Sequence, residues 1–476
     1  MRDVIIRKLN DIYVQVQCSQ AIKKELYEYF SFYAKNYKHM PKYRDGLWDG
    51  KIRLFNYGDQ TLYYGLAGKL VEYLKKEGYS FGIKSHPDFK KPPVTYNQVL
   101  DLPFKPYDYQ LSTIERIFAK KRALVLSPTS SGKSLIIYMA VRQLLAEGKQ
   151  IVIIVPTTSL VEQLYKDFKD YGWSDALKYC HKLYGGAKKI SDKPVLISTW
   201  QSLYRQEKPF FDRFDAVFCD EAHLAQAVSI QGIMQKMPVC EYRIGLTGTI
   251  EDSKTHKLTL QGLFGKIHQT IKTHELMELG IVADLDIIGL QLDHNTHDCK
   301  IVSKMKYQDE IGFLVTHEKR NNLIKNLAID LEGNTLILFQ LVELHGIPLF
   351  QMIKKATKKK VFIVHGEISA QDREDVREYC EEHNDVIIVA SYGTFSTGVS
   401  IKNLDNIILA HPFKSKIKIL QSIGRSLRKA TDDARATLFD VADNLLYSNT
   451  TFKHFKERLK LYANEKFNVE IQKVKL

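Results

Sequence analysis

Residues 127–134, with the sequence Ser-Pro-Thr-Ser-Ser-Gly-Lys-Ser, could hold the phosphates of a nucleotide. An apolar run at 123–126 precedes this loop and a helical pattern follows it, so we expect a strand, a loop and a helix. Backbone N–H groups at such a helix start face an anion, Lys133 reaches the outer phosphates and Ser134 binds Mg²⁺. An ordinary turn is the alternative, because Ser127 stands where the pattern GxxxxGK[ST] has its first glycine. The expected nucleotide-binding residues of the loop are Thr129, Ser130, Ser131, Gly132, Lys133 and Ser134.

A pair of acidic residues, Asp220 and Glu221, follows the apolar run 216–219 and precedes Ala222 and His223. At the carboxyl end of a buried strand, such residues lie beside the phosphate loop of an α/β domain. Asp220 would hold Mg²⁺ through water, and Glu221 would orient or deprotonate the attacking water. Taken alone, an Asp-Glu pair is more often part of a surface loop.

Two further groups could complete a nucleotide site. Gln110, preceded by Tyr107 and Tyr109, could read adenine, because its amide offers a donor and an acceptor while an aromatic ring stacks. Much later in the chain, Gln421 precedes Arg425 and Arg428, which share one face of a predicted helix. Arginines placed in this way can stabilise charge on a γ-phosphate. A basic surface helix is the alternative for this segment.

Two series of apolar runs, each alternating with helical patterns, must position these groups. The first series predicts strands at 123–126, 151–155, 195–198, 215–219 and 243–246, with helices at 134–147 and 159–170. The second predicts strands at 335–339, 361–364, 386–390, 406–410 and 436–440, with helices at 343–355, 370–383 and 416–429. Each series is typical of a doubly wound parallel sheet. The two series predict two domains, at 96–285 and 286–476. Because only the first has a Gly-Lys-Ser loop, we expect the nucleotide to bind in the cleft between them. We also expect the last residues, 447–476, to be helical.

The first 95 residues predict a small basic α+β domain. The expected elements are a strand at 13–18, a helix at 21–33 capped by Ser19, a hairpin of 51–57 with 62–64, and a helix at 66–76 that ends at Gly78. Aromatic and basic residues interleave here, and Trp48, Lys51 and Arg53 could stack on bases and contact phosphates. Ordinary core or turn positions are the alternative for these side chains.

The composition indicates what kind of partner the protein binds, where it is expected in the cell and which metal sites are not expected. A net charge of +14 indicates a polyanionic partner, although a solvated basic surface is the alternative. The sequence has no apolar run of membrane-spanning length and no signal peptide, so we expect a cytoplasmic protein that spans no membrane. Its six cysteines form no Cys-x-x-Cys pair, which argues against a zinc site or an iron–sulfur cluster.

In order and spacing, these segments resemble a superfamily 2 helicase of the DEAH-box type over about residues 100–445. The residues that carry the resemblance are Gln110, 127–134, 156–158, 199–202, 220–223, 247–249, Phe339, 365–367, 396–400 and 421–428. Three further stretches, 46–54, 388–398 and 462–468, are similar to the UvsW helicases of T-even-type phages. The resemblance implies two tandem RecA-like domains after the small α+β domain.

The resemblance also implies roles for individual residues, with ATP and Mg²⁺ as cofactors. Gly398 would lie near the ribose and γ-phosphate of ATP. Thr397 of the second domain and four residues of the first domain would contact the nucleic-acid backbone. The first-domain backbone contacts would be Pro156, Thr157, Thr199 and Gln201. His223, Thr247 and Thr249 would couple hydrolysis to domain movement, although Thr247-Gly248-Thr249 stands where many relatives have Ser-Ala-Thr.

By the same resemblance, the substrate is branched DNA: forks, Holliday junctions, D-loops and R-loops, the last with an RNA–DNA hybrid. We expect a monomer, placed in the host cytoplasm if the chain is phage-encoded. Two alternatives stay open. One is an RNA helicase or remodeller on the same core, and the other is a nucleic-acid scaffold that binds ATP without useful turnover.

Overall fold

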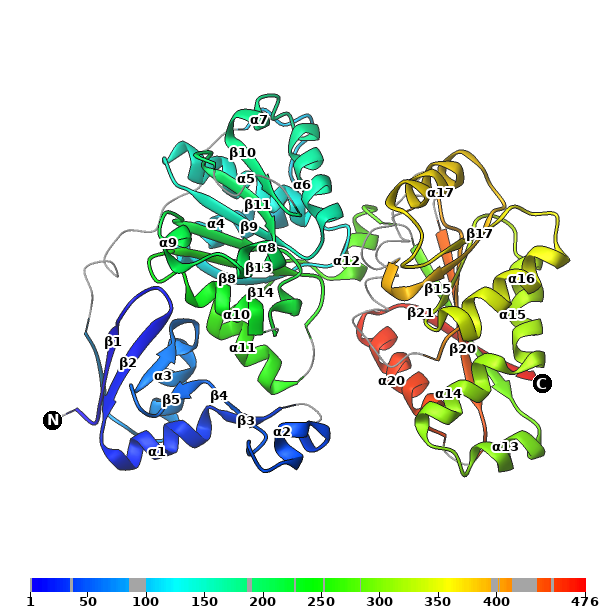
Figure 1. Cartoon of the computed structure of the whole chain (residues 1–476), viewed down its shortest axis with the longest axis horizontal. Helices are drawn as coiled ribbons and strands as arrows, with labels where there is room; N and C mark the ends of the chain where they lie inside the picture. Colours follow the sequence, from blue (N-terminus) through cyan, green and yellow to red (C-terminus); the bar gives the residue numbers. More distant parts are fainter. Residues whose placement is uncertain are drawn as a thin grey trace. The chain divides into compact units, whose positions relative to one another are not determined.

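Over the residues that the structure describes, the chain is organised around three larger β-sheets and one two-stranded sheet, shown in Figure 1. The computed structural model describes residues 2–34, 37–84, 100–185, 191–226, 228–250, 253–282, 284–394, 401, 403–412, 435–446 and 449–476. Contacts divide the chain into two compact units, one of residues 1–127 and 132–270 and the other of residues 128–131 and 271–476. Among the described residues, every helix is too short or too polar to cross a membrane.

The N-terminal domain, described over residues 2–34 and 37–84, is a small mixed sheet with helices. Its sheet has the order β5-β6-β2-β1-β7, in which only β1 and β7 pair in parallel. These strands are β1 Val4–Lys8, β2 Tyr13–Cys18, β5 Phe55–Asn56, β6 Thr61–Tyr63 and β7 Phe81–Lys84, and the helices are α1 Gln20–Tyr29, α2 Pro41–Arg44 and α3 Ala67–Lys76. Val14 and Val16 are buried while their neighbours are not, as a strand with one face on a core requires. The hydroxyl of Ser19 accepts from the backbone N–H of Ile22, which confirms the predicted cap of α1.

Two predicted elements of this domain differ in the structure. The helix expected to reach residue 33 ends at Tyr29, and Ser31–Tyr33 form strand β3, which pairs with β4, Lys51–Arg53. Phe32 and Tyr33 suit a strand, and pairing with β4 gives the backbone groups of this segment hydrogen-bond partners. The strand expected at 51–57 is interrupted at Leu54, whose N–H donates to the carbonyl of Phe30.

The first parallel sheet has seven strands in the order β10-β11-β9-β12-β13-β8-β14. They are β8 Arg122–Leu126, β9 Ile151–Val155, β10 Cys180–Leu183, β11 Val195–Thr199, β12 Ala216–Cys219, β13 Tyr242–Thr247 and β14 Ile267–Gln269. The helices are α4 Asp108–Lys120, α5 Lys133–Ala146, α6 Thr158–Asp170, α7 Ala176–Tyr179, α8 Trp200–Tyr204, α9 Lys208–Phe211, α10 Val228–Gln235 and α11 Lys254–Phe264. All five residues of β9 are buried, which explains its continuous apolar run.

The second parallel sheet also has seven strands, in the order β17-β18-β16-β19-β20-β15-β21. They are β15 Asp284–Asp293, β16 Thr335–Phe339, β17 Val361–Val364, β18 Ile387–Ser391, β19 Asn406–Leu409, β20 Arg435–Asn444 and β21 Asn468–Lys475. The helices are α12 Thr273–Glu278, α13 Thr296–Val302, α14 Tyr307–Thr316, α15 Glu318–Asp330, α16 Ile347–Ala356, α17 Ala370–Glu382 and α20 Thr450–Asn464. The fold is thus two tandem RecA-like parallel sheets after a small α+β domain, as predicted.

The prediction of a helical end at 447–476 is wrong for its last part. The helix α20 ends at Asn464, and β21 then pairs in parallel with β15 at the edge of the second sheet. Most of its residues are charged or polar and exposed, which suits an edge strand. The helix predicted at 343–355 begins with a π-helical turn, Val342–Gly346, before α16.

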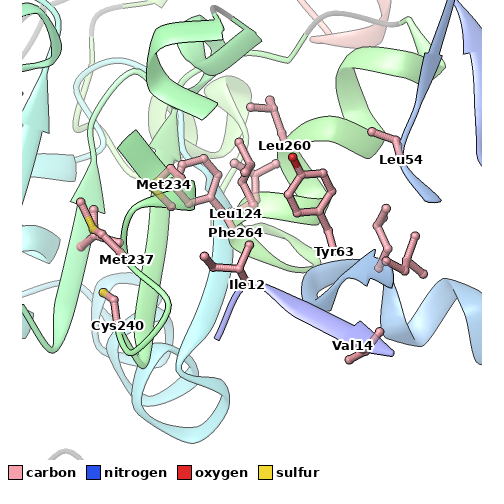
Figure 2. Close-up of a cluster of buried hydrophobic side chains, with 14 of the residues drawn as sticks. Ile12, Val14, Leu54, Tyr63, Leu124, Met234, Met237, Cys240, Leu260 and Phe264 are labelled. Atoms are coloured by element: carbon pink, nitrogen blue, oxygen red, sulfur yellow. The ribbon is translucent and has the colours of Figure 1, made fainter. Parts of the chain in front are cut away.

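The N-terminal domain and the first parallel sheet share one apolar core. Ile12 and Tyr63 of the small domain lie in the same cluster as Leu124, Leu260 and Phe264 (Figure 2). The side chain of Gln235 also donates to the Tyr63 hydroxyl at 2.8 Å.

The backbones of the two parts come close together at α11. A Cβ added to Gly262 would lie 3.0 Å from the Cβ of Tyr63, and one added to Gly65 would collide with the carbonyl oxygen of Gln261. Asp11 N–H donates to the carbonyl of Pro238 at 2.8 Å, which adds a backbone hydrogen bond between the two parts. The small domain is therefore built onto the first sheet without room for intervening water at these points.

Candidate functional site

The loop after β8 turns sharply before α5 begins at Lys133. Ser130 and Gly132 have positive φ angles of 67° and 78°. The ammonium of Lys133 donates to the carbonyl of Ser127 at 3.2 Å, and the hydroxyl of Ser131 donates to the carbonyl of Pro128 at 2.6 Å. The left-handed residues curl the chain around the helix N-terminus, the conformation that a phosphate-binding loop needs.

Ser127, the departure from the glycine pattern, is held by its neighbours. Its N–H donates to the carbonyl of Thr247 at 2.9 Å, and the hydroxyl of Thr270 donates to its Oγ at 2.8 Å. Ser127 is not among the positive-φ residues, so the position does not require glycine. The local structure accommodates this side chain without changing the turn that follows.

Gln110 lies in the first turn of α4, against the phosphate loop. Its Oε1 accepts from the N–H of Tyr107 at 2.9 Å, and its Nε2 occupies the space where a Cβ on Gly132 would stand. The rings of Tyr107 and Tyr109 stack at 5.7 Å with an interplanar angle of 8°. Burial raises the pKa of Tyr109 to about 12, so this ring stays neutral.

The acidic pair lies at the carboxyl end of β12. Asp220 N–H continues the strand pairing by donating to the carbonyl of Ile154 at 2.9 Å. Glu221 has a positive φ of 50°, and its N–H donates to the carboxylate of Asp220 at 3.0 Å. A non-glycine residue in this region turns the chain abruptly at the end of the strand.

His223 connects the acidic pair to the end of the next strand, β13. Its Nδ1 lies 3.0 Å from Thr247 Oγ1 and 3.2 Å from Glu221 Oε2. The hydroxyl of Thr247 donates to the carbonyl of Thr249 at 2.8 Å, which leaves Oγ1 to accept. This hydrogen-bond pattern assigns the ring proton to Nδ1 of His223.

The candidate backbone-binding residues of the first sheet lie at the ends of two adjacent strands. Pro156 and Thr157 follow β9, and Thr199 ends β11 opposite Val155. Thr157 Oγ1 accepts from the N–H of Leu160 at 3.3 Å and caps α6, while the Thr199 and Ser202 hydroxyls lie 3.2 Å apart. Gln201 is exposed on α8.

The carboxyl edge of one sheet thus brings the candidate groups together. Adjacent strands in the order β11-β9-β12-β13-β8 end at Thr199, Pro156, Asp220, the Thr247–Thr249 segment and the phosphate loop. Ligands of open α/β sheets bind at this edge. The ammonium of Lys133, the hydroxyl of Ser134 and the carboxylate of Asp220 suit a nucleoside triphosphate with Mg²⁺, which prefers oxygen ligands.

In the N-terminal domain, the three candidate side chains stabilise local structure. The indole of Trp48 donates to the carbonyl of Lys51 at 2.9 Å, and Lys51 pairs with Glu28 at 3.1 Å. Arg53 pairs with both carboxylate oxygens of Asp49. Nucleic acid would therefore have to compete with existing partners at Lys51 and Arg53.

Five candidate residues fall outside the described part of the chain. They are Thr397, Gly398, Gln421, Arg425 and Arg428.

Sequence reasoning missed a contact to the predicted metal ligand. The hydroxyl of Tyr171, directly after α6, lies 2.7 Å from Ser134 Oγ. In the sequence, Gly172 indicates that the helix ends here and so places Tyr171 at its end. Nothing in the sequence indicates that Tyr171 contacts Ser134.

Comparison with known proteins agrees with this arrangement. Three family models match: "DNA helicase UvsW, N-terminal" over residues 3–84, "Type III restriction enzyme, res subunit" over 103–252, and "Helicase conserved C-terminal domain" over 318–430. The ATP-dependent DNA helicase uvsW of Enterobacteria phage T4 is 36% identical over 501 residues, which cover 98% of both chains.

Two solved structures align with the chain. The crystal structure of T4 UvsW covers 99% of both chains at 32% identity, with a TM-score of 0.49. The ATP-dependent type ISP restriction-modification enzyme LlaBIII bound to DNA covers 86% of this chain and 36% of its own, with 14% identity and a TM-score of 0.58, a likeness of fold alone. Because the identity to the phage T4 protein extends over nearly the whole of both sequences, the chain belongs to the UvsW family of ATP-dependent DNA helicases.

Proposed function

We propose that this protein couples ATP hydrolysis to the unwinding and branch migration of branched DNA, including forks, Holliday junctions, D-loops and R-loops. The observation that carries the proposal is the His223 contact, which joins the proposed hydrolytic residue Glu221 to the strand end at Thr247. Candidate nucleic-acid contacts lie at the same sheet edge, after β9 and β11. The N-terminal family match and the net positive charge support DNA as the polyanion.

In this mechanism, Lys133 binds the outer phosphates and Gln110 selects adenine. Glu221 orients the attacking water and takes its proton. Ser134 and Asp220 would hold Mg²⁺, which would supply positive charge at the phosphates. Arg425 and Arg428, with Gln421, are proposed to stabilise the γ-phosphate from the second domain, and Gly398 to contact the ribose and γ-phosphate.

The backbone contacts determine how DNA is recognised. Pro156, Thr157, Thr199, Gln201 and Thr397 are proposed to touch phosphate and sugar, which carry no base identity. The domains are proposed as 1–95, 96–285 and 286–476, acting as a monomer in the host cytoplasm. Binding should then fall steeply with salt and depend little on base sequence.

The test is steady-state ATP hydrolysis without nucleic acid and with single-stranded DNA, single-stranded RNA or a synthetic four-way junction, all at one salt concentration. If the four-way junction stimulates ATP hydrolysis more than the other nucleic acids do, the proposal is supported. Stimulation by RNA alone would replace it with an RNA remodeller, and hydrolysis under none of these conditions would indicate an ATP-binding scaffold. Glu221→Gln is the control, because it should still bind ATP while losing turnover.

A further inference from the structure

Tyr171 is held in place by the way α6 ends. Its neighbour Gly172 has a φ of 93°. The N–H of Trp173 donates to the carbonyl of Phe168 at 3.2 Å, and the N–H of Gly172 donates to the carbonyl of Lys169 at 2.9 Å. These two bonds form a Schellman motif, which closes the helix in one conformation. The Tyr171 side chain therefore leaves a fixed backbone position.

Two aromatic side chains then fix the direction of the Tyr171 ring. Its centroid lies 5.4 Å from that of Tyr138 at an interplanar angle of 60°, and 5.8 Å from that of Phe104 at 83°. Both are edge-to-face geometries that aromatic pairs favour. Tyr138 lies on α5 four residues after Ser134, so the two occupy the same helix face one turn apart. A ring packed on Tyr138 can thus place its hydroxyl at Ser134, where the O–O distance is 2.7 Å.

The proton of the Ser134 hydroxyl decides what this contact does. A serine oxygen carries one proton and two lone pairs, and a metal ligand must offer a lone pair to the ion. The proton then has to point elsewhere, toward an acceptor. The hydroxyl of Tyr171 can be that acceptor at 2.7 Å.

We propose that Tyr171 is a positioning residue of the nucleotide site, which accepts the Ser134 proton and keeps a serine lone pair directed at Mg²⁺. This inference rests on the proposed function, in which Ser134 is a metal ligand. Partners that orient a metal ligand commonly change metal affinity about 10–100-fold when removed. The opposite arrangement, with Tyr171 donating to Ser134, would make the two hydroxyls compete with the ion.

The experiment measures binding of a non-hydrolysable ATP analogue, once with saturating Mg²⁺ and once with EDTA. The ratio of the two affinities gives the gain due to Mg²⁺ and is independent of turnover. Tyr171→Phe removes the hydroxyl and keeps the ring, so we expect the gain to fall about 10-fold while affinity in EDTA stays the same. Tyr179→Phe is the matched control, because Tyr179 stacks on Trp173 in the same aromatic cluster.

Ser134→Ala separates the proposal from the function on which it rests. Loss of the Mg²⁺ gain in Ser134→Ala confirms the serine as ligand, and adding Tyr171→Phe should then change nothing further. An unchanged gain in Ser134→Ala would refute the ligand assignment and the proposal with it. If Ser134→Ala loses the gain but Tyr171→Phe keeps or raises it, only the positioning role is overturned. Thermal unfolding of each variant identifies any loss of the aromatic packing.

Discussion

Nδ1 of His223 lies 3.0 Å from the hydroxyl oxygen of Thr247. The two residues follow adjacent parallel strands, β12 and β13, and the same nitrogen lies 3.2 Å from Glu221. Helix α11 begins at Lys254, soon after Thr249, and packs against the N-terminal domain. The hydrogen bond between His223 and Thr247 therefore links the acidic pair to the Thr247–Thr249 segment. Along the chain, that segment leads to α11, the helix that packs against the small domain.

His223→Ala should reduce DNA unwinding more than ATP turnover. The substitution removes the hydrogen bond to Thr247 and the contact to Glu221, and it leaves Lys133 and Asp220 in place. A coupling contact of this kind is worth roughly 0.5–2 kcal/mol, so we expect strand separation per ATP to fall about 2–30-fold. The measurement is turnover and strand separation in the same preparation. Thr247→Ser, which keeps the hydroxyl, is the control, and an equal fall in both rates would contradict the coupling role.

Gly65→Ala should destabilise the unit that contains the N-terminal domain. The new methyl group would meet the backbone carbonyl of Gln261, which cannot rotate away. Overpacking of this kind costs about 1–3 kcal/mol. Gly68→Ala is the control, since nothing lies within 4 Å of its added Cβ and alanine favours α3 by about 0.5–1 kcal/mol. Equal unfolding free energies of the two variants in denaturant titrations would argue against the close approach.

The second unit should lose stability in acid through Asp443. Burial alone raises the pKa of this carboxyl, but Arg320 at 2.9 Å and the bond to His294 outweigh burial and lower the pKa. Because the folded-state pKa is the lower one, the stabilisation is complete above the unfolded-state pKa and disappears as pH falls through the folded-state value. Unfolding midpoints measured across this range check the direction.

Asp443→Asn tests the same pair at neutral pH. It leaves Arg320 buried without a counter-charge, which typically costs about 3–5 kcal/mol, and it should flatten the acid dependence. Asp286→Asn, which breaks an exposed pair with Arg435, should cost less than about 1 kcal/mol. Similar losses in the two variants would show that the buried pair contributes little.

Lys42→Ala and Arg44→Ala should weaken DNA binding by the N-terminal domain. Both side chains are exposed on α2, whereas Lys51 and Arg53 already pair with acids. If either contacts a phosphate, its removal lowers the slope of log affinity against log salt by about 1. Binding titrations on one junction at several salt concentrations give that slope. A slope equal to that of the unsubstituted protein would exclude the residue from the interface.

The sequence was sufficient for the central strands and for the residues at their ends. Buried parallel strands such as β9 and β12 are continuous apolar runs, so Asp220 could be placed at the end of a strand beside the phosphate loop. Edge strands such as β10 and β21 are short or charged and give no such signal. The Tyr171 contact depends on how α5 and α6 pack, and the pairs of Lys51 and Arg53 depend on partners that only the folded chain brings near.

The shared core of Figure 2 has a consequence for how this family can diversify. A truncated motor without the small domain would present Leu260 and Phe264 to water and would be prone to aggregation. The small domain could be exchanged between relatives only together with α11, because Gly65 and Gly262 lie where the two backbones come too close for a larger side chain. Recombination in nature or in the laboratory should therefore succeed at crossovers after β14 and fail at crossovers between β7 and α4.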